Sequence, residues 1–468
     1  MTLRVRVALI VGLCTLTAAG AAACRQPALV PAPPQPAVSP EDDAFLEDLS
    51  RRTFMFFWEQ ADPGTGIVRD RSRTDGGPAN EQAKNIGSIA SVGFGLSGMC
   101  IAAERGWLPR AQVLDRTRTT LRFFGERMPQ EHGWFFHFVN LQTGAREWQS
   151  ELSSIDSALL LAGVLTVRQC FAGDPEIARL AEGIYRRVDF QWMLAGDPAV
   201  LSHGWKPESG FLSGRWDHYC ELMILYLLGI GSPTHSIPAA SWRAWSRPVM
   251  SFERFAYVSG PDPLFVHQYS HAWVDFRGRR ESGPPDTARS PAMRPGIIDW
   301  FENSVVATRA HKAFCLSLAK EFPGYSDNVW GITASDSQKG YVAWGGPPRH
   351  PAIDGSVVPA AAAGSLMFTP DITVPALREM RRRFGDRIYG RYGFADAFHP
   401  TSGWVNPDVI GIDLGITLLS AENARTGNVW RWFHRNPEVQ KAMSQLFEPR
   451  GARTLACRVE SHSTRFAS

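Results

Sequence analysis

Apolar residues recur with helical spacing along most of the chain, and two kinds of helical pattern alternate. In the amphipathic kind, as in Asp42–Gln60, they form one stripe among charged residues. In the buried kind, as in Ile86–Arg105, they fill almost every position. The periodicity predicts about twelve helices, over residues 42–60, 86–105, 109–127, 153–171, 175–193, 216–229, 238–253, 296–321, 355–368, 372–384, 411–425 and 436–447. The apolar/polar alternation typical of strands is scarce.

This alternation of patterns predicts an all-α fold. One packing that satisfies it is an (α/α)6 barrel, in which six buried helices form an inner ring inside six amphipathic ones. The inner helices would need small residues for close packing, and Gly93, Gly95, Gly98 and residues 360–363 supply them. An irregular helical array is the alternative that the pattern leaves open.

Five long segments have no periodicity: residues 62–85, 194–215, 260–295, 324–354 and 389–410. Such segments inside a compact domain are usually functional. Each precedes a buried helix, so a barrel would gather them at one end as active-site loops. They bring aromatic and imidazole side chains to that end, namely Trp205, Trp216, Trp273, Trp330, Trp344, Trp404, His267, His271 and His399.

The segment from Trp205 to Leu228 places three acids beside aromatic residues. Its first half is a loop punctuated by Pro and Gly, and its second half is an apolar run of helical length. Glu208, Asp217 and Glu221 lie in the loop or in the first turns of the expected helix. Burying a carboxylate is costly unless it is paired or needed for function. Acids beside aromatic residues at the start of a buried helix therefore suggest a sugar-binding site. A helix cap at Asp217 with a capping-box partner at Glu221 explains the pattern equally well.

Further acids fall at the same expected end of the barrel, namely Glu151, Asp156, Asp354 and Asp413. Glycoside hydrolysis needs one carboxylic acid to protonate the leaving oxygen and one carboxylate to activate water or attack. Glu221, one turn into an apolar helix, fits the acid because burial raises the pKa of a carboxyl group. Asp413 fits the base because a helix N-terminus stabilises an anion. Structural capping explains each acid taken singly, whereas the cluster favours catalysis.

Composition and motifs exclude several other classes of function. A net charge of +3 on 468 residues, with no dense Lys/Arg cluster, argues against a nucleic-acid or anionic-membrane surface. The sequence holds no P-loop, no GxGxxG motif after a strand and no GxSxG motif. His267, His271 and Asp275 could share a helical face, but Gln268 breaks the zinc-protease pattern. We therefore favour hydrogen bonds from these histidines to sugar hydroxyls or loop backbone, and expect no metal and no cofactor.

The N-terminal residues are typical of an export signal. Residues 1–24 combine a positive start, a short apolar run and small residues that end at Cys24, the expected site of lipidation. Plain signal cleavage is the alternative. Residues 25–41 are Pro-rich and predict an extended tether. Cys100, Cys170, Cys220 and Cys315 lie in apolar runs, so we expect buried thiols rather than a disulfide framework.

Seven sequence blocks are recognisable, and they are SSIDSALLLAGVL, GRWDHYCELMILYLLGIGSPTH, PLFVHQYSHAWVDFRG, WGITASDSQKGYVAWGGPP, IDGSVVPAAAAGSLMF, GRYGFADAFHP and DVIGIDLGITLLSAENARTG. In this order, from about Phe45 to Met443, they resemble the bacterial glycoamylase-like family. That family includes endo-β-1,2-glucanases and the C-terminal domains of cyclic β-1,2-glucan synthases. Cys220 is a departure, because relatives often have Ser there, and it should not matter to the chemistry.

The resemblance implies an (α/α)6 barrel that acts on β-glucans with inversion and without a metal. The family's acidic motifs match here at Glu151, Asp156, Asp217, Glu221 and Asp413. In related β-1,2-glucanases the acid can act through a substrate hydroxyl, so contact with the leaving oxygen is not required. Family membership fixes neither the substrate nor the endo or exo mode, because loops decide those.

These observations predict an exported, lipid-anchored, monomeric hydrolase that cuts β-1,2-glucan internally. Residues 42–448 would form the catalytic domain and residues 449–468 a tail. A surface glycan-binding protein and a transglycosylase are the alternatives. Glu221 would be the acid, Asp413 the base, and Asp156, Glu151 and Asp217 would hold or tune them. The expected sugar-binding residues are Trp205, Glu208, Trp216, His218, His267, His271, Trp273, Trp344, Asp354 and Trp404.

Overall fold

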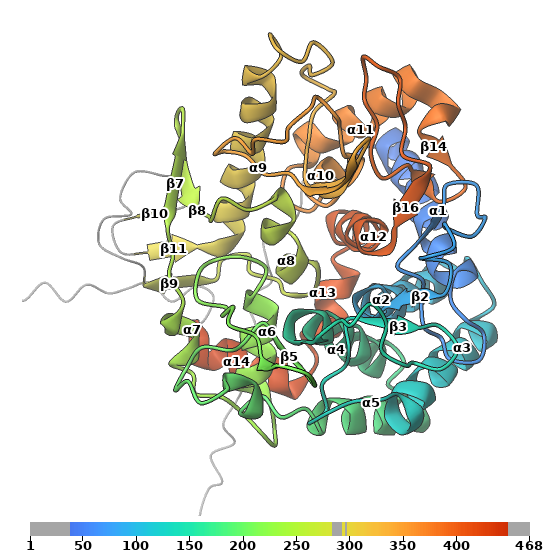
Figure 1. Cartoon of the computed structure of the whole chain (residues 1–468), viewed down its shortest axis with the longest axis vertical. Helices are drawn as coiled ribbons and strands as arrows, with labels where there is room; N and C mark the ends of the chain where they lie inside the picture. Colours follow the sequence, from blue (N-terminus) through green and yellow to red (C-terminus); the bar gives the residue numbers. More distant parts are fainter. Residues whose placement is uncertain (1–37, 283–292, 295–296, 448–468) are drawn as a thin grey trace, which may run out of the picture. The chain divides into compact units, whose positions relative to one another are not determined.

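The computed structural model describes residues 38–282, 293–294 and 297–447 (Figure 1). The expected signal, Cys24, most of the tether and the tail at 449–468 lie outside these residues. The chain divides into two units, Met1–Pro31 and Ala32–Ser468, and every described residue belongs to the second. Across the described ranges, no helix is both long and apolar enough to cross a membrane.

The described part of the chain is predominantly helical. Its α-helices are α1 (Pro40–Glu59), α2 (Ile89–Arg105), α3 (Arg110–Arg122), α4 (Ser154–Cys170), α5 (Pro175–Arg186), α6 (Met223–Gly231), α7 (Ser241–Ala244), α8 (Tyr269–Trp273), α9 (Trp300–Ser317), α10 (Pro359–Ala363), α11 (Pro370–Phe384), α12 (Gly411–Arg425), α13 (Asn428–Phe433) and α14 (Pro437–Leu446). Figure 1 shows α2, α4 and α12 in the interior, with α1, α3 and α5 outside them.

The predicted helices agree best where the periodicity is long. The segments expected at 42–60, 153–171, 372–384 and 411–425 correspond to α1, α4, α11 and α12. The helix expected at 238–253 is wrong, because only α7 is helical there and residues 249–252 form a strand. The helix expected from 216 begins seven residues later, at Met223. The short helices α8 and α13 were not predicted.

Short antiparallel strands connect the loops to one another, although the sequence shows little of the alternation typical of strands. They are β1 (Arg71–Arg73), β2 (Ile86–Ser88), β3 (Phe138–Asn140), β4 (Leu152–Ser153), β5 (Gly204–Lys206), β6 (Gly210–Phe211), β7 (Val249–Phe252), β8 (Phe255–Val258), β9 (Arg280–Ser282), β10 (Met293–Arg294), β11 (Ile297–Asp299), β12 (Ala334–Ser337), β13 (Gly340–Ala343), β14 (Tyr389–Gly390), β15 (Gly393–Phe394) and β16 (Asp408–Ile410). With only two to four residues each, they are too short to show an alternating pattern in the sequence.

Glycine brings the two central helices α2 and α4 into backbone contact. A Cβ atom on Gly93 would lie 2.2 Å from the carbonyl oxygen of Leu159, and one on Gly163 would lie 2.1 Å from the carbonyl oxygen of Gly93. No side chain fits at either position. The expectation that Gly93 serves close helix packing is therefore confirmed.

A disulfide joins the same two helices near their C-terminal ends. Cys100 and Cys170 are bonded, with their Cα atoms 6.1 Å apart. The expectation of free thiols at these two positions is wrong, because two cysteines 70 residues apart in sequence give no local sign of pairing. Cys220 and Cys315 are free and buried, as expected.

Strands lead directly into the interior helices, and this places the acids. β2 runs into α2, β4 into α4 and β16 into α12. β1 pairs with β16, and β5 pairs with both β4 and β6, so loops far apart in the sequence lie side by side. Asp156 and Asp413 lie in the first turns of α4 and α12. The strands therefore fix the N-terminal ends where these carboxylates stand.

Candidate active site

Glu221 lies in the loop just before α6. The helix begins at Met223, and Leu222 at its N-cap makes no side-chain capping bond. Both the placement of Glu221 one turn into a helix and the capping-box alternative are therefore wrong. Its backbone carbonyl accepts a hydrogen bond from Ser270 Oγ at 2.7 Å. Burial, together with the negative charges of Asp262 and Asp156, raises the pKa of Glu221 to about 7.

Asp413 forms a buried pair with Asp396, a residue that the sequence analysis did not select. Asp413 is 6% exposed and Asp396 is 4% exposed. Burial raises the pKa of both carboxyl groups, and the neighbouring Asp396 raises that of Asp413 further, so the hydrogen-bonded pair shares a proton. Ser335 Oγ also donates to Asp396. The anion-stabilising effect expected from the α12 N-terminus is outweighed by this burial.

Arg71 of β1 is a positive charge near this pair, but other acids already engage it. Its Nε donates to Asp70 Oδ2 at 2.9 Å and its Nη1 to Asp336 Oδ2 at 2.7 Å. The pair also borders a cavity of about 20 Å³ whose walls are mostly apolar, including Leu49 and Phe394. Because Arg71 is already engaged, the shared proton, rather than a positively charged side chain, reduces the repulsion between Asp413 and Asp396.

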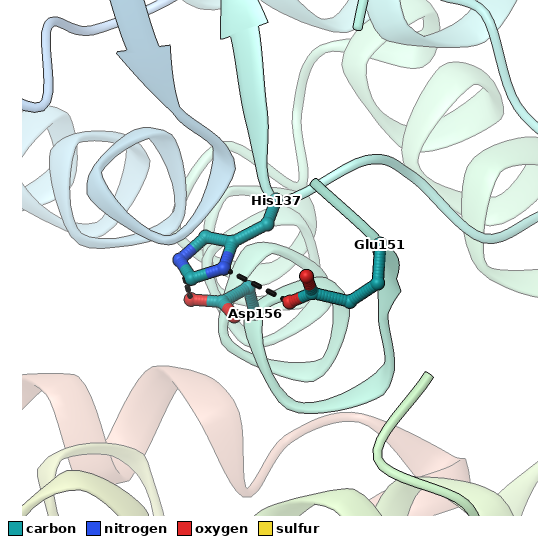
Figure 2. A group of neighbouring side chains, drawn as sticks. All are labelled: His137, Glu151 and Asp156. Carbon is teal, nitrogen blue, oxygen red and sulfur yellow. Dashed lines mark hydrogen bonds and ion pairs between the residues drawn. The ribbon is translucent and has the colours of Figure 1, made fainter. Parts of the chain in front are cut away.

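His137, Glu151 and Asp156 form a second acidic group, here called the triad (Figure 2). His137 Nδ1 lies 3.1 Å from Glu151 Oε1, and His137 Nε2 lies 3.5 Å from Asp156 Oδ1. Burial lowers the pKa of His137, but the two carboxylates outweigh burial and raise it. The hydrogen bond from His137 in turn lowers the pKa of Glu151. Asp156 Oδ2 also accepts a hydrogen bond from Ser153 Oγ at 2.5 Å.

The triad also has the residue types of a metal site. One ligand atom from each residue lies within 4.8 Å of the others. Each ring nitrogen of His137 faces a carboxylate, however, which is the arrangement of an imidazolium bridging two anions (Figure 2). A protonated His137 therefore offsets one of the two negative charges of the triad with the residues present.

One carboxyl group from each of these groups lies near enough to Tyr269 for its charge to act on the hydroxyl. Burial raises the pKa of the Tyr269 hydroxyl, and so do the negative charges of Asp413, Glu221 and Asp156. The three carboxylates come from separate stretches of the chain, namely α12, the loop before α6, and α4. We call this set, with Asp396, Glu151 and His137, the acid site.

Several predicted sugar-binding residues are held by neighbouring protein groups. The exposed Glu208 accepts from Arg146 Nη1 at 2.5 Å. The exposed Asp217, predicted to tune the catalytic acids, lies 2.9 Å from His218 Nδ1. Asp354 Oδ1 accepts from the backbone amide of Ser356 at 2.9 Å. Four of the predicted residues are partly exposed, and they are Trp205, His218, Asp354 and Trp404.

Five of the predicted sugar-binding residues lie in the core. Trp273, Trp344 and His271 are 0% exposed, His267 is 2% exposed and Trp216 is 7% exposed. The indole nitrogens donate to Ser97 Oγ from Trp273, to the Ala352 carbonyl from Trp344 and to Ser154 Oγ from Trp216. A buried side chain has little surface to offer a ligand, so the burial of these five residues argues against their predicted role in sugar binding.

His267 and His271 do not share a helical face. His267 ends a 3-10 helix, and His271 belongs to α8. His267 pairs with the hydroxyls of Tyr219 and Ser259, and His271 with that of Ser304. Burial lowers the pKa of both imidazoles to about 3, so they are neutral. Their hydrogen bonds join buried segments of the core to one another.

Two aromatic side chains near the acids were missed by the sequence analysis. Trp148 is 49% exposed and Tyr341 is 58% exposed. Phe138, whose ring is 4.9 Å from that of Trp148, is stacked on His137 at 3.8 Å. Tyr341, on β13, lies near enough to Asp413 to feel its charge. Trp148 stands among polar residues, and Tyr341 lies in a stretch rich in Gly and Pro, so neither pattern singles out the ring, and only the fold reveals that both are exposed.

Comparison with known proteins gives consistent matches. The Glycoamylase family model, described as "Putative glucoamylase", matches residues 213–437. The crystal structure of a "putative glucoamylase" from Bacteroides fragilis NCTC 9343 is 30% identical, with a TM-score of 0.77, and the alignment covers 89% of this chain and 99% of that one. An endo-β-1,2-glucanase from Chitinophaga pinensis, solved with sophorotriose and glucose, is 28% identical, with a TM-score of 0.76 and coverage of 88% and 99%.

A further relative is the exo β-1,2-glucooligosaccharide sophorohydrolase (non-reducing end) of Parabacteroides distasonis. It is 26% identical over 450 residues, which are 86% of this chain. The chain spans 58% of the length of that relative.

Proposed function

This chain belongs to the glycoamylase-like family, and on that basis we propose that it is a glycoside hydrolase that cuts β-1,2-glucan internally. The observation that carries the proposal is a set of carboxyl groups from separate elements, Glu221, Asp413 and Asp156, that lie near enough to the buried Tyr269 for their charges to act on it. Glycoside hydrolysis needs one protonated and one ionised carboxyl group. Glu221, with its raised pKa, supplies the first, and the Asp413–Asp396 pair, which shares a proton, supplies the second. The relatives whose names mention β-1,2-linked glucans support the choice of substrate.

In the proposed fold the helices complete an (α/α)6 barrel. The packing of α2 between α12 and α4, and of α4 between α2 and α6, supports an inner ring. The packing of α1 on α12 and of α5 on α4 supports an outer one. In this arrangement the strands β2, β4 and β16 enter the inner ring at the end that carries the acid site.

Glu221 is the proposed general acid. With a pKa of about 7 it keeps its proton in neutral and mildly acidic solution. It gives that proton to the leaving glycosidic oxygen, directly or through a substrate hydroxyl. Asp413 is the proposed base: with the shared proton on Asp396, its carboxylate accepts a proton from the attacking water. The oxygen of that water bonds to the sugar carbon as the carbon–oxygen bond to the leaving group breaks, which inverts the configuration.

A reducing-end assay tests the proposal. Wild-type protein is incubated with linear β-1,2-, β-1,3-, β-1,4- and α-1,4-glucans, and the products are sized by chromatography. We expect oligomers of several lengths from the β-1,2 polymer alone. Release of only a disaccharide would show exo action instead. Unchanged reducing ends with shifted chain lengths would show transglycosylation, and an unchanged polymer would point to glycan binding.

The matched variants are Glu221→Gln and Asp371→Asn. The first should lower kcat by roughly 10³-fold or more, because an amide cannot donate the proton. The second removes an exposed partner of Arg309 on α11 and should keep wild-type activity. A Glu221→Gln variant with near wild-type turnover would remove Glu221 from the mechanism.

We also propose that the protein is exported and held to a membrane by lipid on Cys24, and that it acts as a monomer. The Cys100–Cys170 disulfide supports export, because such bonds persist mainly in oxidising compartments. Labelling with a fatty-acid analogue tests the anchor, and the label should be lost in Cys24→Ser. Light scattering of the folded domain tests the monomer.

A further inference from the structure

Trp148 projects a large apolar ring into solvent beside the acid site. Among the described residues, the large hydrophobic side chains that count as exposed are Trp148 at 49%, Val249 at 45% and Tyr341 at 58%. We propose that Trp148 is a platform on which one glucosyl unit of the substrate chain stacks. The inference rests on the proposed function, and it names a binding residue that neither the acidic motifs nor the family match identifies.

Exposure alone would not carry this inference, because single exposed hydrophobic residues are ordinary on protein surfaces. The backbone supplies a second observation. Trp148 and the following Gln149 both adopt left-handed conformations, with φ angles of 51° and 49°. Residues with side chains are disfavoured there, and consecutive examples persist only where the surrounding structure holds them.

The loop is held in this conformation by a set of polar contacts. Arg146 donates to the backbone carbonyls of Gln149, at 2.7 Å, and Ser150. Its guanidinium also makes two bonds to Glu208, which ties the loop to the turn between β5 and β6. Ser150 Oγ bonds to the backbone of Phe138. Glu208, expected to bind sugar, therefore fixes the loop that carries Trp148.

The position of the ring connects it to the triad. The rings of Trp148 and Phe138 are 4.9 Å apart, and the ring of Phe138 stacks on that of His137 at 3.8 Å. His137 in turn bonds to Glu151. A flat apolar face beside an ionised carboxylate suits a pyranose ring, whose CH groups pack on the aromatic face while its hydroxyls donate to the carboxylate.

Three variants test the platform: Trp148→Ala, Trp148→Phe and the control Val249→Ala. Val249 lies in β7 and matches Trp148 in exposure. Each variant is tested on β-1,2-linked gluco-oligosaccharides of increasing length, with thermal melting to confirm folding. We expect Trp148→Ala to raise KM about tenfold for chains long enough to reach the ring, the size that one aromatic contact supplies, with kcat unchanged. Trp148→Phe should recover most of this loss, and Val249→Ala should match wild type.

Two results would overturn the platform. A Trp148→Ala variant whose KM equals that of Val249→Ala at every chain length would show that no sugar stacks there. A uniform fall in kcat, independent of chain length, would show that Trp148 only supports His137. Failure of the proposed function looks different, because wild-type protein would then cut no member of the series, which would remove both proposals together.

Discussion

The Asp413–Asp396 pair and the His137–Glu151–Asp156 triad solve the same electrostatic problem in opposite ways. Both bring two carboxylates together, and one from each, Asp413 and Asp156, acts on Tyr269 through its charge. In the triad an imidazole lies between the carboxylates, and the pKa of Glu151 falls. In the pair the nearby Arg71 is already bonded to Asp70 and Asp336, and the pKa of both carboxyl groups rises.

The difference shows what each group can do at neutral pH. The triad keeps Glu151 ionised, so it offers a fixed negative charge to the hydroxyl groups of a sugar and to positive charge that develops on the sugar during bond cleavage. The pair holds a proton that can change position, so it can take part in proton transfer. Residue type alone does not separate these roles, since all four acids are Asp or Glu. The roles differ because a cation, His137, lies between the acids of the triad, whereas the cation near the pair, Arg71, is bonded to other acids.

Asp413→Asn tests the pair where the effect should be largest. An amide cannot accept the proton of the attacking water, so we expect kcat on β-1,2-glucan to fall by roughly 10³-fold or more. Glu151→Gln in the triad should act mainly on KM. Steady-state kinetics of both variants, beside Asp371→Asn, measures the contrast. Equal losses of kcat in Asp413→Asn and Glu151→Gln would erase the distinction between the two groups.

His137→Gln removes the cation of the triad. Because the hydrogen bond from His137 lowers the pKa of Glu151, the loss of the imidazole should raise that pKa and weaken binding. We expect kcat/KM to fall about tenfold, which is the equivalent of one pKa unit. His235→Gln, at an imidazole 43% exposed, is the control.

A separate experiment, on the wild-type protein, tests whether the positive charge of the triad comes from protonated His137 or from a metal ion. Treatment with a chelator should leave wild-type activity unchanged if His137 supplies the positive charge. Loss of activity on chelation, restored by a divalent cation, would show that the triad is a metal site instead.

Asp396→Asn should stabilise the fold at neutral pH. The pKa of Asp396 is raised in the folded state, so the free energy of unfolding falls as the pH rises and Asp396 ionises. An amide at this position does not ionise and avoids that loss of stability. We expect a gain of about 1 kcal/mol at pH 7 that disappears near pH 4, where both carboxyl groups are protonated. Denaturant unfolding at the two pH values measures it. A variant less stable than wild type at pH 7 would show that the interaction with Ser335 outweighs repulsion.

Asp262→Asn should give the smallest effect, on the pH profile. Glu221 must be protonated to act as the acid, so activity should fall as the pH rises through about 7. Burial is the main cause of this raised pKa, and the negative charge of Asp262 adds to it. Removal of that charge should move the alkaline limb of kcat/KM to lower pH by a few tenths of a unit. A shift to higher pH would contradict the assignment of that limb to Glu221.

Long helices could be predicted from the sequence because their signal is local and repeated. The strongly apolar α4 and α12 and the amphipathic α1 and α11 each extend over at least fifteen residues. The five-residue α8 and the strand β7 offer too few residues for either periodicity to register. The Cys100–Cys170 bond depends on how α2 and α4 pack, which no pattern within one helix reports.

For the site, acids were easier to predict than their partners. Glu221, Asp413, Asp156 and Glu151 stood out because charged residues beside apolar runs are unusual. Asp396 and His137 matter only because the loops that carry them fold back against Asp413 and Glu151. The tryptophans were misjudged for a related reason: Trp273 and Trp344 pack in the core, and the less conspicuous Trp148 is exposed.

The glycine contact between α2 and α4 has a consequence for how such enzymes diversify. Gly93 and Gly163 fix the spacing of two helices at their backbones, and Asp156 stands in the first turn of one of them. Substitutions at Trp148 can therefore alter the proposed sugar contact while the backbone that positions Asp156 stays in place. Chain-length preference and bond-breaking chemistry can then be inherited separately, and a lineage can change one without risking the other.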